Sequence, residues 1–181
     1  MKKYFSRLLA SVLVVCMMVP AMASLVYATD ISDLERLAQT ERIVSHGTYQ
    51  YGDITLTFAS GEPIYETSDD RAASRAAVSY PFYIFDENGD LLLSRIMGFT
   101  INGSSGNYSF STPDEWSWTT VEVGEGVLLS GVKNTRVSAT VAEHAFTWFV
   151  NDKEFRTVVT FVLNQNTMSV TLFAIQNTPM N

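Results

Sequence analysis

The most regular pattern of hydrophobic and polar positions lies in the C-terminal part of the chain, between Val137 and Ile175. From Glu154 to Asn164 the positions alternate, and the segments 146–150 and 168–174 show the same period of two. Side chains alternate between the two faces of a strand, so this pattern predicts three antiparallel strands. The connectors 151–153 and 164–167 are rich in Asn and Asp, which tolerate the positive φ of tight hairpin turns.

The same alternation predicts how the three strands are aligned. If the turns fall at Asp152-Lys153 and Gln165-Asn166, both hairpins place their apolar residues on one common face. The opposed pairs are then Trp148 with Thr157 and Phe161 with Val170.

Two features complicate this simple sheet. The apolar phase changes near Glu143-His144, which predicts a β-bulge or a change of packing environment. The opposite face is also partly apolar, so we expect another element to cover it. Its apolar residues are Phe149, Val158, Val162, Phe173 and Ile175.

One helix is predicted near the N-terminus. Ser32-Asp33-Leu34-Glu35 has the form of a capping box, and apolar residues follow at helical spacing. The pattern predicts an amphipathic helix over 32–42. Its apolar stripe is a candidate to cover the second face of the C-terminal sheet.

The remaining pattern predicts mostly short strands joined by turns. They are expected at 43–51, 53–59, 79–85, 91–102, 107–111 and 115–123, with a weak strand at 127–129. Asn88-Gly89 marks a hairpin turn, and the polar segment 66–77 is expected to be an exposed loop. About nine or ten strands at this spacing predict an all-β fold, a mostly antiparallel β-sandwich, with an up-and-down β-barrel as the alternative.

The first 28 residues have the pattern of a signal peptide. Lys2, Lys3 and Arg7 precede a 12-residue apolar region, Leu8 to Val19, and Ala28 provides a small residue for cleavage. We therefore expect a signal peptide at 1–28 and one extracytoplasmic domain at 29–181. No membrane span is expected after cleavage.

Cysteine content and charge narrow the setting of this domain. The chain has a single cysteine, Cys16, which lies inside the predicted signal, so no disulfide is expected in the mature domain. A secreted domain of about 150 residues can bury a core without disulfides, which favours a bacterial exported protein; the form of the signal favours a Gram-positive source. The mature chain has 9 basic and 19 acidic residues, a net charge of −10, which argues against nucleic acid or anionic membranes as partners. We expect a monomer or weak dimer.

Motifs for metal binding and catalysis are missing from the sequence. Asp86-x-Asn88-x-Asp90 resembles the start of a calcium loop, but Leu91 and Met97 stand where an EF-hand requires Gly and Glu. His46 and His144 lie in no zinc or nucleophile motif. The sequence thus predicts no metal, no cofactor and no identifiable catalytic residue.

A strip of aromatic residues is the candidate ligand-binding site. If the turn at 111–114 pairs the segments around it, aromatic rings and polar groups gather on one face. Aromatic rings stack on the apolar face of a sugar, and amide or carboxylate groups bind its hydroxyls. The alternative is that the rings belong to the core. The candidate residues are Tyr108, Phe110, Trp116, Trp118, Asn107 and Asp114.

Together these features favour an exported, non-catalytic β-domain that binds a cell-envelope glycan or a protein partner outside the cell. A small β-barrel that carries an apolar ligand is one alternative. A secreted hydrolase that uses carboxylates the pattern does not identify is another.

Overall fold

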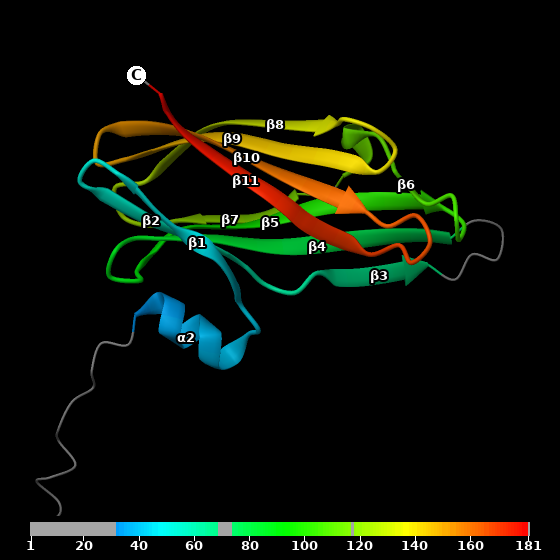
Figure 1. Cartoon of the computed structure of the whole chain (residues 1–181), viewed down its shortest axis with the longest axis horizontal. Helices are drawn as coiled ribbons and strands as arrows, with labels where there is room; N and C mark the ends of the chain where they lie inside the picture. The colour runs from blue at the N-terminus through cyan, green and yellow to red at the C-terminus, as the bar shows by residue number, and fades with distance from the viewer. Residues whose placement is uncertain (1–31, 69–73, 117, 181) are drawn as a thin grey trace, which may run out of the picture. The chain divides into compact units, whose positions relative to one another are not determined.

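The fold is an all-β sandwich of two antiparallel sheets, as the alternation predicts. The computed structural model describes residues 32–68, 74–116 and 118–180. Among them are eleven strands, one α-helix and a 3-10 helix (Figure 1). The strands form two separate sheets and not a closed barrel, so the barrel alternative is wrong.

The larger sheet has the strand order β1-β2-β4-β5-β6, with β3 paired to β4 and β7 paired to β5. Its strands are β1 (Val44–Tyr51), β2 (Ile54–Ser60), β3 (Ile64–Ser68), β4 (Ser74–Phe85), β5 (Leu91–Gly103), β6 (Ser109–Phe110) and β7 (Trp118–Val123). The 3-10 helix η2 (Pro113–Glu115) connects the last two. The smaller sheet has the order β11-β10-β9-β8, formed by β8 (Leu128–Arg136), β9 (Val141–Val150), β10 (Lys153–Leu163) and β11 (Val170–Met180).

The core fills the space between the inner faces of the two sheets. Phe82 of β4 meets Phe146 of β9, and Phe99 of β5 meets Phe161 of β10 with ring centroids 4.8 Å apart. Burial of each large side chain of this kind contributes about 1.5–3 kcal/mol. Aromatic contacts between the layers therefore supply much of the stability.

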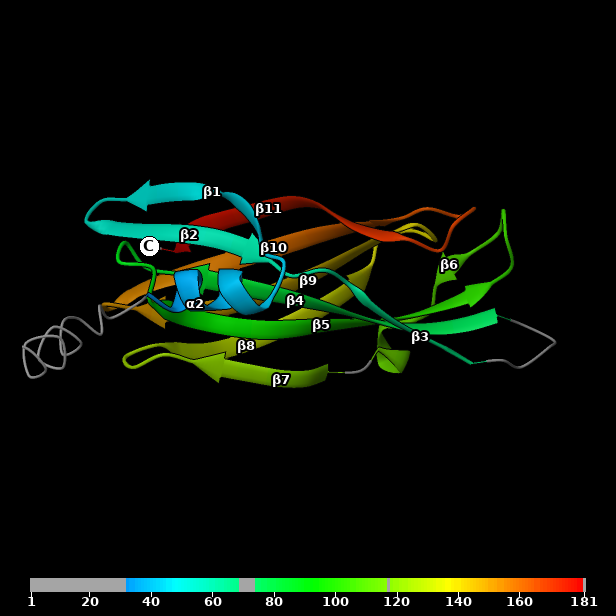
Figure 2. The ribbon, with the colours of Figure 1, turned by 90° about the horizontal axis from the view of Figure 1, so that it is seen from below.

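The helix α2 (Asp33–Thr40) forms where the capping box predicts it, and Ser32 accepts a hydrogen bond from the backbone of Glu35 at 3.3 Å. It packs on the outer face of the larger sheet, where Leu34 and Leu37 join a cluster with residues of β2, β4 and β5 (Figure 2). The expectation that it covers the smaller sheet is wrong.

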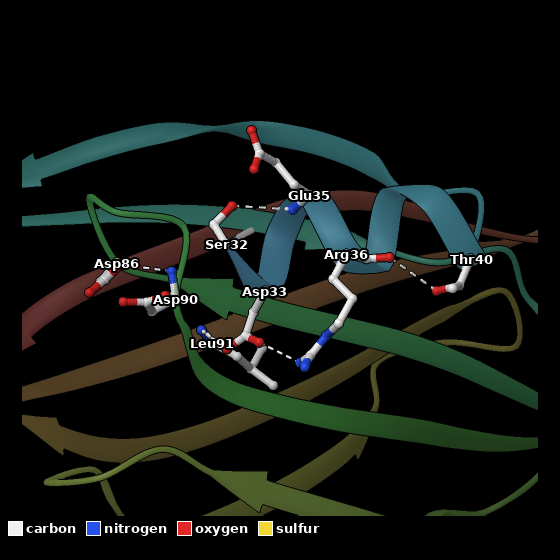
Figure 3. Close-up of polar contacts among 8 residues, drawn as sticks. All are labelled: Ser32, Asp33, Glu35, Arg36, Thr40, Asp86, Asp90 and Leu91. Carbon is white, nitrogen blue, oxygen red and sulfur yellow. Dashed lines mark hydrogen bonds and ion pairs between the residues drawn. The ribbon is translucent and has the colours of Figure 1, made fainter. Parts of the chain in front are cut away.

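Polar contacts explain why the helix docks there. The Asp33 carboxylate accepts from the backbone N–H of Leu91 at 3.0 Å (Figure 3). In addition, the backbone N–H of Leu34 donates to the carbonyl oxygen of Gly89 at 2.9 Å. The Asp86 carboxylate accepts from the backbone of Asn88 and of Asp90, which folds this turn locally. The turn that resembles a calcium loop is therefore a docking point for α2.

Both predicted hairpin registers are wrong, although the faces are right for β9 and β10. Trp148 lies opposite Phe155 because the turn is Asn151-Asp152, whose φ angles are 49° and 59°. This register differs from the prediction by two residues, which preserves the faces because the period of a strand is two. In the second hairpin Phe161 lies opposite Leu172, not Val170.

The predicted bulge at Glu143-His144 is absent, because β9 pairs with β10 without interruption. The change of phase arises before the strand, in the turn that ends at Val141. A bulge occurs instead in β11, where Phe173 lies outside the ladder and is 73% exposed. Past this bulge, Ile175 lies opposite Val159 and therefore faces the core. Of the second apolar face, Phe149, Val158 and Val162 remain as half-buried residues.

The segment predicted as a loop at 66–77 holds strand residues at both ends. β3 extends to Ser68, and β4 begins at Ser74, with Ala76 and Val78 fully buried. β3 is a short edge strand, and its residues whose side chains are described are exposed. Its sequence therefore lacks the alternation of apolar and polar residues that predicts a strand.

Docking of α2 can be tested at Gly89. An added Cβ there would lie 2.9 Å from Ser32 Oγ, and the φ of 80° disfavours any side chain. Gly89→Ala should reduce the free energy of unfolding by about 2 kcal/mol or more, measured by urea denaturation. Gly126→Ala is the matched control, because its φ is 73° but no atom lies within 4 Å. It should cost only about 1 kcal/mol; equal losses in both variants would contradict the role of the helix contact.

Candidate functional site

The predicted aromatic strip does not form on the surface. Phe110 and Trp116 are 1% and 4% exposed, and both rings contact Phe99 in the core. Tyr108 is partly buried against the same core, whereas Asn107 and Asp114 are exposed. The side chain of Trp118 lies outside the described residues. Phe110 and Trp116 therefore present no ring face to solvent.

The reason lies in the sheet topology. The prediction required the segments 107–111 and 115–123 to pair with each other. Instead, β6 and β7 pair separately with β5, at Ile101 and Asn102 for β6 and at residues 93–97 for β7. The helix η2 lies between β6 and β7 in the chain, and both strands pair with the edge of β5 that β4 does not occupy. Phe110 and Trp116 enter the core beside this edge.

A different site lies where the edges of the two sheets approach each other. A cleft of about 400 Å³ lies between β1, the edge strand of the larger sheet, and β11, the edge strand of the smaller one. We call it the β1–β11 cleft. It is lined by Tyr49, Tyr51, Phe58, Ile175, Gln176, Asn177 and Thr178. No formally charged side chain lines it, since every charged residue type is missing from this set.

Strand alternation directs four of these side chains into the gap between the sheets. Tyr49 lies opposite the core residue Leu56, so it projects from the inner face of the larger sheet, as does Tyr51 two residues on. Asn177 lies opposite the buried Thr157, so it projects from the inner face of the smaller sheet, as does Ile175. The cleft is thus an opening into the space between the layers.

Tyr49 is the exposed aromatic residue of the cleft. The residue is 43% exposed, and its ring meets the ring of Phe58 edge to face, at 5.6 Å between centroids and 68° between planes. The ring also packs against Gly47, where an added Cβ would lie 3.5 Å from the nearest ring atom. These contacts hold the ring in one orientation.

Tyr51 connects the two edge strands. Its hydroxyl donates to the backbone carbonyl oxygen of Asn177 at 3.1 Å, and its ring packs on Phe155 of the smaller sheet at 5.3 Å. This bond also occupies an acceptor on the outer edge of β11.

A chain of hydrogen bonds fixes the Asn177 side chain from inside the core. The indole N–H of Trp148 donates to Thr157 Oγ1 at 2.9 Å, and Thr157 Oγ1 lies 2.6 Å from Asn177 Oδ1. Trp can only donate, so the Thr157 hydroxyl accepts that bond and donates its hydrogen to Asn177. Asn177 Nδ2 is buried and has no hydrogen-bond partner among the described residues. An unsatisfied buried donor costs about 1–3 kcal/mol.

The histidines do not form a catalytic centre in the described residues. His46, the bulged residue of β1, places Nε2 2.7 Å from Ser60 Oγ, and burial lowers its pKa. Ser60 itself is buried, so its hydroxyl is closed to a substrate from solvent. The geometry is that of a structural hydrogen bond between β1 and β2.

His144 lies in the core, with its ring stacked on Trp116 at 5.4 Å. Arg95 of β5 also points into the core, and its guanidinium lies 5.5 Å from the centroid of Phe146. Burial lowers the pKa of Arg95 to about 10. Burial and, to a lesser extent, the charge of Arg95 lower the pKa of His144 well below its ordinary value. Arg95 shares the parity of Leu93 and Met97 in the sequence, which is the signal that could have located this buried cation.

The depressed pKa of His144 predicts acid sensitivity. Below the unfolded-state value of about 6.5, the unfolded chain binds a proton that the folded chain excludes. Stability is therefore full above this pH and falls as the pH drops. From pH 7.5 to pH 5.5 the free energy of unfolding should decrease by about 1.4 kcal/mol from this residue. Urea denaturation at both pH values checks this. His144→Gln should flatten the dependence, whereas His46→Gln should retain most of it; an unchanged slope in His144→Gln would contradict the assignment.

In the described part of the chain, no group of three or more His, Cys, Asp or Glu side chains is arranged to hold a metal ion. None of the described helices has the length and apolar character needed to cross a membrane.

The chain matches no family model, no curated protein and no solved structure.

Proposed function

We propose that this protein is a non-catalytic binding module that takes an uncharged carbohydrate chain in the β1–β11 cleft. The observation that carries the proposal is the exposed, fixed ring of Tyr49 in a cleft that the polar residues Gln176, Asn177 and Thr178 also line. Flat aromatic rings pack on the C–H face of a sugar, while neighbouring polar groups bind its hydroxyls. The sequence suggested this chemistry for residues 107–118, and the proposal assigns it to the β1–β11 cleft instead.

Pre-orientation strengthens this proposal. The Tyr49 ring is held by Phe58 and Gly47, and its hydroxyl donates to the carbonyl oxygen of His46 at 3.4 Å. A ring that is already fixed loses little conformational entropy when a ligand binds. Since the lining has no formal charge, a neutral ligand fits it better than an anionic one.

An added peptide strand fits this edge less well. Strand addition requires a regular edge with free backbone groups. Here β1 carries a bulge between Ser45 and Gly47, and β11 carries one at Phe173. Pro179 supplies no N–H, and Tyr51 already binds the carbonyl oxygen of Asn177. Such features protect edges from pairing with other chains.

The location we propose is outside the cell, in a Gram-positive bacterium. The support is the signal pattern at 1–28, which lies outside the described residues. The partner is then a cell-envelope or environmental polysaccharide.

Binding can be measured by titration calorimetry with neutral oligosaccharides, namely hexamers of β-1,4-glucose, β-1,3-glucose, xylose, mannose and N-acetylglucosamine. We expect at least one to bind the wild type, and Tyr49→Ala to weaken it about tenfold or more through lost stacking. Tyr108→Ala is the matched control, because Tyr108 belongs to the strip first predicted from the sequence, and it should bind as the wild type does. Absence of binding at millimolar concentrations, an equal loss in both variants, or binding of extended peptides alone would overturn the proposal.

A further inference from the structure

We infer that Asn177 determines which sugars the β1–β11 cleft selects, by donating from Nδ2 to a carbonyl oxygen of the ligand, so that the preferred glycan carries acetamido groups. This inference rests on the proposed function. It adds the class of sugar and the residue that recognises it.

The hydrogen bonds around Thr157 define the orientation of the Asn177 amide. The indole N–H of Trp148 is a donor, so Thr157 Oγ1 must accept from it at 2.9 Å. The Thr157 hydroxyl donates its hydrogen to Asn177 Oδ1, 2.6 Å away, so the amide oxygen faces Thr157. Nδ2 is consequently the atom left to interact with a ligand.

This amide belongs to the wall of the cleft. Asn177 lines the β1–β11 cleft together with Ile175 and Tyr51. Nδ2 is screened from solvent and has no hydrogen-bond partner among the described residues. Ligand binding therefore includes a small displacement of the side chains that line the cleft, after which the donor gains an acceptor. Pairing a buried donor is favourable because it removes the desolvation cost of an unmade hydrogen bond.

A carbonyl oxygen is the acceptor that best matches this position. It accepts a hydrogen bond at an atom that carries no hydrogen, and the N–H of a trans acetamido group points away from that oxygen. A sugar hydroxyl would bring its own O–H into the same buried place. The methyl group of an acetamido substituent is apolar, and the half-buried Ile175 offers apolar surface in the same cleft. The carbonyl oxygen of an acetamido group thus has a donor in Asn177, and its methyl group has apolar surface to contact.

The test uses two ligands that differ only at the group in question. Hexamers of β-1,4-linked N-acetylglucosamine and of β-1,4-linked glucose share the same backbone, and only the first has an acetamido group in place of the 2-hydroxyl. By titration calorimetry the wild type should bind the acetylated hexamer about tenfold more tightly, the value of one added hydrogen bond and methyl contact. Equal affinity for the two hexamers would overturn the inference.

Substitutions at Asn177 and Thr157 test which residues cause the preference for the acetylated hexamer. Asn177→Asp keeps the acceptor for Thr157 and replaces the Nδ2 donor with a carboxyl oxygen, so the tenfold preference for the acetylated hexamer should disappear. Thr157→Val removes the hydroxyl that orients the amide and should reduce the preference, and Thr157→Ser should restore it. A retained preference in Asn177→Asp would show that another residue recognises the acetamido group.

The outcomes separate this inference from the proposal on which it rests. If neither hexamer nor any other oligosaccharide binds, the proposed function fails. If glycans bind and Tyr49→Ala weakens them, but acetylation makes no difference, the proposed function stands and the assignment to Asn177 falls.

Discussion

The packing of two inner sheet faces against each other is the constraint on which the rest of this protein depends. Each antiparallel sheet is apolar on one face, and neither face could remain in water. The aromatic contacts between β4 or β5 and β9 or β10 close that interface. Because Arg95 and His144 are also on inner positions, the core has to accommodate a cation and an imidazole among aromatic rings.

Two stacked open sheets leave edges, and the β1–β11 cleft is what remains where two of them approach each other. Residues at inner positions of a central strand are buried from both sides. The same positions on an edge strand, such as Tyr49 and Asn177, are buried from one side only. The hydrogen bond from Tyr51 to the carbonyl oxygen of Asn177 holds the edges together without closing the opening. This cleft needs no loop, because the two edge strands themselves provide its walls.

The candidate site could not be located from the sequence, for identifiable reasons. The aromatic pattern at 108–118 suggested a surface strip because neighbours in sequence were assumed to pair, whereas β6 and β7 both pair with β5. Asn177 lies past a bulge that changes the phase of β11, so the alternation read from Val170 onward places it on the outer face with Phe173, whereas it faces inward. Tyr49 showed no signal beyond its place in a predicted strand.

The sequence by itself determined the class of the fold, the capping of α2 and the alternating faces of β9 and β10, because these depend on interactions between residues close along the chain. It did not determine the exact registers, since a shift of two residues leaves every side chain on the same face. The face that α2 covers, the burial of Phe110 and Trp116, and the meeting of Tyr49 with Asn177 depend on contacts between distant segments. Only the tertiary structure decided these, because packing of the two sheets selects one arrangement among several that satisfy the same local pattern.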